Sequence, residues 1–160
     1  MAKKEKNNST FKQLKELKAD QKEIHEAEVK DVIKETYQGP DSFEQKTKYR
    51  FAKSLRWYEI LITVIISGIF LMIAFLVDIY AMPGKYFAST MTTILIVFGL
   101  LVWLIMGWIK NRRAAGYYND ARRRYLATMT DEEAWIVKIR KLVLIFVIIQ
   151  VIGAGFSFLI

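Results

Sequence analysis

Residues 60–77 have the sequence ILITVIISGIFLMIAFLV, a run of 18 residues between Glu59 and Asp78 without an ionisable side chain. A second run, residues 86–109, adds 24 residues without Asp, Glu, Lys, Arg or His. A helix rises about 1.5 Å per residue and needs about 20 apolar residues to cross a hydrocarbon core about 30 Å thick. Because lipid offers the backbone no hydrogen-bond partner, the two runs predict membrane-spanning helices folded back as a hairpin.

The short segment between the two runs contains Pro83 and Gly84, a pair that suits the central positions of a type II turn. A third apolar block, residues 142–160, predicts a third span. The chain is 53% hydrophobic and 25% charged, and the two kinds of residue are segregated into separate blocks. We therefore expect an all-α integral membrane protein with three transmembrane helices, a long cytoplasmic N-terminal helix and helical cytoplasmic extensions.

Basic residues mark one side of the predicted membrane protein. Residues 1–56 carry 14 Lys and Arg against 10 Asp and Glu, and residues 110–141 carry 9 against 4. The loop of residues 78–88 holds only two charged residues, Lys85 and Asp78. The positive-inside rule then predicts a cytoplasmic N-terminus and an outer C-terminus. No apolar segment of a signal peptide precedes the first span, and the Lys- and Ile-rich composition is compatible with a bacterial cytoplasmic membrane.

The pattern divides the chain into five segments. They are a charged helical arm in the cytoplasm, a juxtamembrane amphipathic helix, the transmembrane hairpin, a basic cytoplasmic loop and the third span, over residues 1–40, 41–58, 59–109, 110–141 and 142–160.

Within the arm, Thr10 and Gln13 have capping-box spacing and Gly39 and Pro40 form a stop signal, which predicts a helix over residues 10–38. Its apolar stripe is thin and interrupted. The arm is therefore open to three interpretations: a solvated helix supported by Lys–Glu pairs, a docking helix for a cytoplasmic protein, or a self-association surface.

A second capping-box pattern, Ser42 with Gln45, predicts a helix that runs unbroken into the first span. Its basic and aromatic residues suit the headgroup region, with Trp57 and Tyr58 at the inner interface. A further helix start is expected at Thr130, followed three residues later by Glu133.

Small and polar residues inside the spans predict helix packing or contact with a partner subunit. A glutamine at membrane depth must find hydrogen-bond partners, so Gln150 is expected to face another helix. A pore lining, or a cofactor or lipid slot beside Trp103, would be a sharper interpretation of the same residues. The packing or partner-contact prediction covers Thr63, Ser67, Gly68, Gly99, Trp103, Gly107, Gln150, Gly153, Ala154 and Ser157.

Basic residues beside the spans predict contact with anionic lipid headgroups. Interleaved arginines and tyrosines after the second span superficially resemble an RNA-binding patch, but their position directly after a transmembrane helix favours lipid, so nucleic acid is not expected. An acidic protein partner is the other alternative. The lipid-contact prediction covers Lys53, Arg56, Lys110, Arg112, Arg113, Arg122, Arg123 and Arg124.

Residues that could carry catalysis are scarce. The chain has no cysteine, and its single histidine, His25, lies on the charged arm. No phosphate-binding loop, dinucleotide turn, serine elbow or zinc-protease motif is present, so the sequence predicts neither catalytic residues nor a cofactor nor a metal site, and we do not expect an enzyme.

These features favour a non-catalytic accessory or scaffolding subunit of a multi-subunit membrane complex of the transport or secretion type. Its expected partners are membrane lipids, other membrane subunits or further copies of itself, and a cytoplasmic protein bound by the arm. One alternative is a self-assembling pore lined by Gln150, Ser157 and residues 89–93. Another is a membrane-embedded enzyme that uses Glu59, residues 122–124 and residues 131–133.

Overall fold

The computed structural model describes residues 2–81 and 86–157, with side chains from residue 11 to residue 156. It is 87% helical, with no strand among the described residues, which confirms the all-α prediction. The predicted turn at Pro83 and Gly84 lies outside the described residues. The helices are α1 (Ala2–Gln38), α2 (Ser42–Ala52), α3 (Trp57–Tyr80), α4 (Phe87–Tyr117), the short 3₁₀ helix η1 (Ala121–Arg123) and α5 (Asp131–Ser157).

Two helical stretches in the described part of the chain are long and apolar enough to cross a membrane. They are Ser42–Tyr80, whose apolar part is α3, and α4. In the most apolar 18-residue segment of each stretch, only 11% and 17%, respectively, is buried within the protein. Most large apolar side chains of these segments therefore face outward, where a hydrocarbon solvent would stabilise them.

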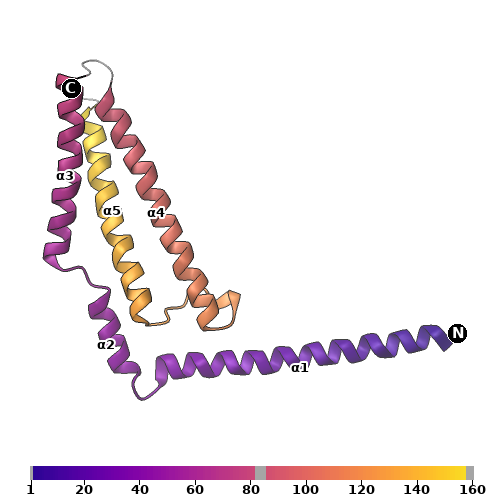
Figure 1. Ribbon diagram of the computed structural model, residues 1–160. Coiled ribbons are helices and arrows are strands. Elements are labelled where there is room, and N and C mark those ends of the chain that lie inside the picture. Colours follow the sequence, from indigo (N-terminus) through magenta and orange to yellow (C-terminus); the bar gives the residue numbers. More distant parts are fainter. Residues whose placement is uncertain (1, 82–85, 158–160) are drawn as a thin grey trace.

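Helices α3, α4 and α5 run side by side, with α5 packed against both of the others (Figure 1). Buried alanines at 74, 88, 114 and 134 contribute to this packing, because small side chains let helix backbones approach closely. Helix α5 thus packs against both helices of the predicted hairpin, α3 and α4.

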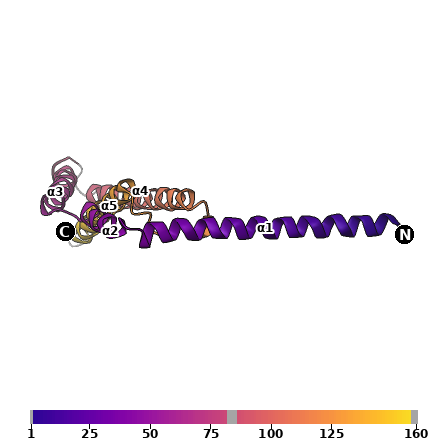
Figure 2. The ribbon, with the colours of Figure 1, turned by 90° about the horizontal axis from the view of Figure 1, so that it is seen from below.

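Helix α1 leaves the base of this bundle and extends sideways, which places its N-terminal end far from α3, α4 and α5 (Figures 1 and 2). Its backbone is helical from Ala2, so the predicted start at Thr10 is wrong. The extra residues are mostly Lys, Glu and Asn, and helix formers such as Lys and Glu continue a helix once it is nucleated.

The predicted continuous helix from Ser42 into the first span is also wrong, since α2 ends at Ala52 and α3 begins at Trp57. Arg56 has an extended backbone, with φ −85° and ψ 148°, and its N–H donates to the Glu59 carboxylate at 2.9 Å. The acid therefore caps a new helix here instead of continuing the old one.

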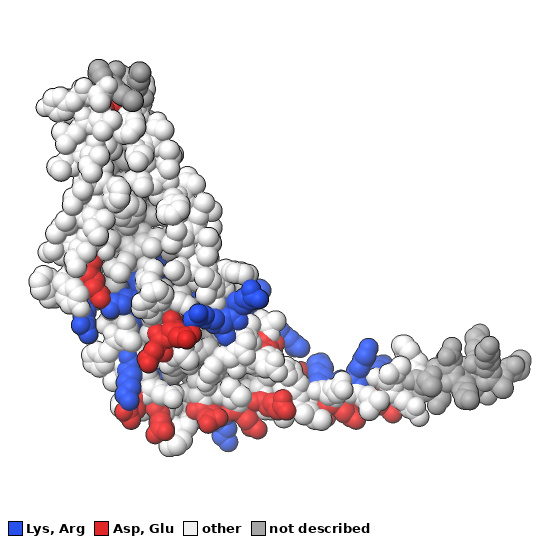
Figure 3. Space-filling model, in the orientation of Figure 1, with Lys and Arg blue, Asp and Glu red and all other residues white. Residues whose placement is uncertain are grey.

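Charged side chains are distributed unevenly over the face shown in Figure 3. The upper part of the bundle is almost free of charged side chains, whereas basic and acidic groups gather at its base and along α1. The polar end of the bundle, the loop between α4 and α5 and the arm therefore lie on the same side of the apolar part of the bundle.

Candidate functional site

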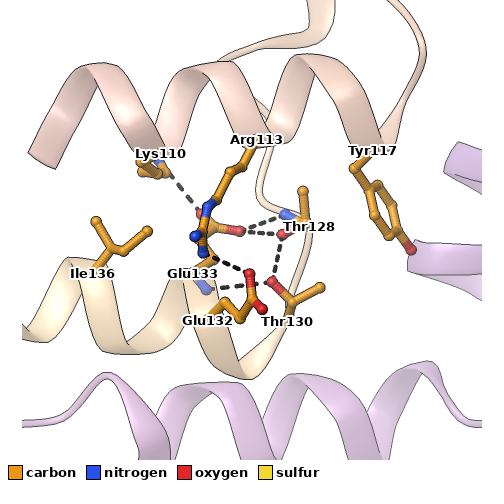
Figure 4. Close-up of a pocket in the computed structure, with 8 residues that line it drawn as sticks. All are labelled: Lys110, Arg113, Tyr117, Thr128, Thr130, Glu132, Glu133 and Ile136. Carbon is orange, nitrogen blue, oxygen red and sulfur yellow. Dashed lines mark hydrogen bonds and ion pairs between the residues drawn. The ribbon is translucent and has the colours of Figure 1, made fainter.

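The polar end of the bundle is organised around one buried carboxylate, that of Glu133 in the first turn of α5. Its side chain is 5% exposed. One oxygen, Oε2, accepts the backbone N–H of Thr128 at 2.5 Å and the Thr128 hydroxyl at 2.8 Å. The Thr130 hydroxyl accepts the Glu133 N–H at 3.3 Å (Figure 4). The loop is thereby folded onto the start of α5, which begins beside the predicted Thr130.

The other oxygen of Glu133 reaches two more elements. Tyr49 of α2 donates its hydroxyl to Oε1 at 3.1 Å, and Lys110 of α4 lies 3.5 Å from the same atom. Burial, together with the nearby carboxylate, raises the pKa of Tyr49, so this phenol stays protonated and acts as a donor. A single acid thus joins α2, α4, α5 and the connecting loop.

A cavity of about 360 Å³ lies beside this carboxylate, between α4, α5 and the loop (Figure 4). Arg113 and Glu132 form an exposed ion pair at its edge, at 2.5 Å. Since Lys110 and Arg113 are both paired with acids, no unbalanced charge is left in the cavity for an ionic ligand. The lining residues are Lys110, Arg113, Tyr117, Thr128, Thr130, Glu132, Glu133 and Ile136.

The same end of the bundle fastens the arm. The Thr36 and Tyr117 hydroxyls are 3.2 Å apart, and the Tyr37 hydroxyl donates to the Ala127 carbonyl at 2.8 Å. Tyr118, fully buried, donates to that carbonyl as well, at 2.7 Å. Burial raises the pKa of Tyr118, which keeps this donor protonated. The C-terminal part of α1 is therefore held by side-chain contacts across the loop.

Within the bundle, the structure brings Gln150 and Ser67 together, both fully buried. Gln150 Nε2 donates to Ser67 Oγ at 2.8 Å and lies 3.3 Å from the Ser67 carbonyl. Its Oε1 is buried and has no partner among the described residues. The amide therefore links α5 to α3 through its nitrogen alone.

Three predicted glycines meet side chains of neighbouring helices. A Cβ at Gly153 would lie 2.3 Å from Leu71, and one at Gly99 would lie 2.5 Å from Val147. Gly107 lies under Arg140, whose guanidinium stacks on Trp103 at 4.2 Å from the ring centroid.

The other predicted packing residues are less uniform. Thr63 is half-buried and donates to the Glu59 carbonyl, and Ala154 is half-buried too. Gly68 is exposed, with nothing within 4 Å of a Cβ built on it, so it takes no part in packing within the chain. The Ser157 side chain lies outside the described residues.

The eight predicted lipid-contact residues fall into two groups. In the first, Lys110, Arg113, Arg122 and Arg123 face carboxylates of Glu133, Glu132 and Asp120. In the second, each cation lies over an aromatic ring: Lys53 on Tyr49, Arg56 on Tyr58, Arg112 on Trp108 and Arg124 on Tyr125.

Sequence reasoning missed Tyr49, Thr128 and Arg140 as site residues. The capping spacing of Thr130 and Glu133 and the basic residues Lys110 and Arg113 pointed to this region, but neither pattern revealed the long-range partners. Among the described residues, no group of three His, Cys, Asp or Glu side chains is placed to hold a metal ion.

Comparisons of the chain with models of protein families, with curated proteins and with solved structures returned no match.

Proposed function

We propose that the chain is a non-catalytic accessory or scaffolding subunit of a multi-subunit membrane complex, of the transport or secretion type. The observation that carries the proposal is the arm: α1 spans 37 residues, is held at its C-terminal end by Thr36 and Tyr37, and extends away from the bundle (Figure 1). A rigid helix anchored at one end can present its free length to another protein.

The proposal includes three spans, with α5 as the third. Helix α5 runs beside α3 and α4, and its buried Gln150 bonds to Ser67 of α3. An amide inside a bundle is stabilised by a partner on another helix, which supports a membrane position for this part of α5. The basic end of the bundle would then lie in the cytoplasm of a bacterial cell, with the N-terminus, and the C-terminus would lie outside.

Exposed apolar side chains on α1 supply a docking surface. Phe11 is 73% exposed, Leu14 56%, Leu17 58% and Ile24 61%. Leu14, Leu17 and Ile24 lie on one side of the helix by their spacing, and nothing in the described chain covers them. Burial against a partner helix would stabilise a complex by about 1.5 to 3 kcal/mol for each large side chain that becomes fully buried.

Affinity purification of the tagged full chain from native membranes in mild detergent tests the proposal. We expect unlike subunits in a fixed ratio, and we expect Leu14→Ser with Leu17→Ser to reduce their yield by more than about tenfold, the equivalent of about 1.4 kcal/mol. Lys12→Ser with Lys15→Ser is the matched control on another side of the same helix. Recovery of the chain only alone or as a simple homo-oligomer would contradict the proposed role.

A further inference from the structure

A second cavity, of about 500 Å³, lies between α4, η1 and α5 at the end of the α4 apolar run. Two of its lining residues, Trp103 and Leu104, belong to that run. Toward the polar end it is lined by Arg112 and Arg124, and Arg140 of α5 lines it too. The cavity thus combines an apolar wall with three arginines.

The three arginines of this cavity differ from their neighbours in having no acid. Lys110 and Arg113 are paired with Glu133 and Glu132, and Lys138 pairs with Glu59 at 2.5 Å. By contrast, none of the three cavity arginines forms an ion pair with a described carboxylate, and no acid lines the cavity. Arg112 and Arg124 lie over the rings of Trp108 and Tyr125, at 5.3 and 4.8 Å from the centroids. Their positive charge is therefore left for a ligand to balance.

Arg140 gives a separate indication that the cavity suits an anion. Its Nε is buried and has no hydrogen-bond partner among the described residues. The guanidinium is held in place by stacking on Trp103, and Gly107 provides the room, because a Cβ there would lie 3.1 Å from Nη2. A buried donor without an acceptor destabilises a folded protein, so an acceptor at this position would stabilise the site.

We propose that this cavity binds the phosphate of an anionic phospholipid from the leaflet at the basic end of the bundle. Arginines match phosphate oxygens in charge and geometry. The indole of Trp103 and the side chain of Leu104 provide an apolar surface for the glycerol and the first acyl carbons. A free phosphate ion would leave that apolar wall uncovered, and this favours the lipid. The inference depends on α4 crossing the membrane and does not depend on the accessory-subunit role.

Native mass spectrometry of the full chain tests the site. The chain is purified in mild detergent and mixed with phosphatidylglycerol or with zwitterionic phosphatidylcholine. We expect one phosphatidylglycerol to be retained in preference to phosphatidylcholine. Arg112→Gln with Arg124→Gln should weaken its retention by about fivefold for each arginine, as expected for a basic residue near an anionic headgroup. Arg140→Gln should weaken retention of phosphatidylglycerol as well. If Arg140→Gln does not fold, the double variant of the exposed residues Arg112 and Arg124 still provides the test.

The matched control is Arg113→Gln with Arg122→Gln, which removes two neighbouring arginines that already have acids. It lowers the net charge by the same amount and should leave lipid retention unchanged. Equal losses in both double variants would overturn the proposal in favour of diffuse attraction, as would equal retention of the two lipids. Displacement of the lipid by inorganic phosphate would also overturn it, because the site would then take a free anion.

Discussion

Gln150 of α5 donates from Nε2 to the hydroxyl of Ser67 on α3 at 2.8 Å, and both side chains are completely buried. The pair lies inside the apolar part of the bundle, where water cannot replace a lost partner. The contact therefore ties the position of α5 to α3 at a defined level.

Replacing these two residues singly and together should show that they interact. We expect Gln150→Leu and Ser67→Ala each to lower the free energy of unfolding in detergent by about 1 kcal/mol, as found for hydrogen bonds between transmembrane helices. The double variant should cost less than the sum, because no buried polar group is left alone. Unfolding titrations in mixed micelles measure all four proteins. Strictly additive losses would contradict a direct interaction.

A glycine at a helix contact and an exposed glycine should tolerate alanine very differently. In Gly99→Ala the new methyl would lie 2.5 Å from Val147, whose branched side chain cannot easily move, and we expect a loss of about 1 to 3 kcal/mol in unfolding free energy. Gly68→Ala, which meets nothing within 4 Å, should be neutral or slightly stabilising, since alanine favours helix. The same micelle titration measures both variants. Equal effects would mean that α4 and α5 do not pack closely at Gly99.

The long apolar helices α3 and α4 could be predicted because the length of an apolar run is a local property of the sequence. The break before Trp57 could not, because capping-box spacing allowed a start at Ser42 and did not reveal a second one. Glu59, which directly precedes the apolar run, accepts the N–H of Arg56 and caps the start of α3.

The candidate site was harder to predict because its partners are far apart in sequence. The hydrogen bond between Tyr49 and Glu133 depends on the packing of α2 against α5, which the sequence pattern does not reveal. In the sequence, Arg112 and Arg113 are equivalent basic neighbours. In the structure one stacks on Trp108 and the other pairs with Glu132, because adjacent residues on a helix point in different directions.

Glu133→Gln should loosen the polar end of the bundle while keeping the shape of the side chain. It removes the charge that faces Lys110 and weakens bonds to Thr128 and Tyr49, so we expect a loss of about 2 to 3 kcal/mol in unfolding free energy. Hydrogen exchange should speed up in α2 in particular. Glu132→Gln is the control, because its ion pair is exposed and contributes less than about 1 kcal/mol. A similar loss in both variants would exclude a special role for Glu133.

Alkaline pH should weaken the folded protein through Tyr49. Its pKa lies above the ordinary value of 10.0 in the folded state, so above that pH the unfolded chain loses a proton that the folded chain retains. Stability from this group is therefore complete below pH 10.0 and falls as the pH rises toward the pKa in the folded state. We expect Tyr49→Phe to make the unfolding free energy fall less steeply between about pH 10 and pH 11 than it does in the wild type. Tyr86→Phe, at a tyrosine that is 73% exposed, should leave the slope unchanged. Parallel slopes for all three proteins would show that Tyr49 is not buried against the carboxylate in solution.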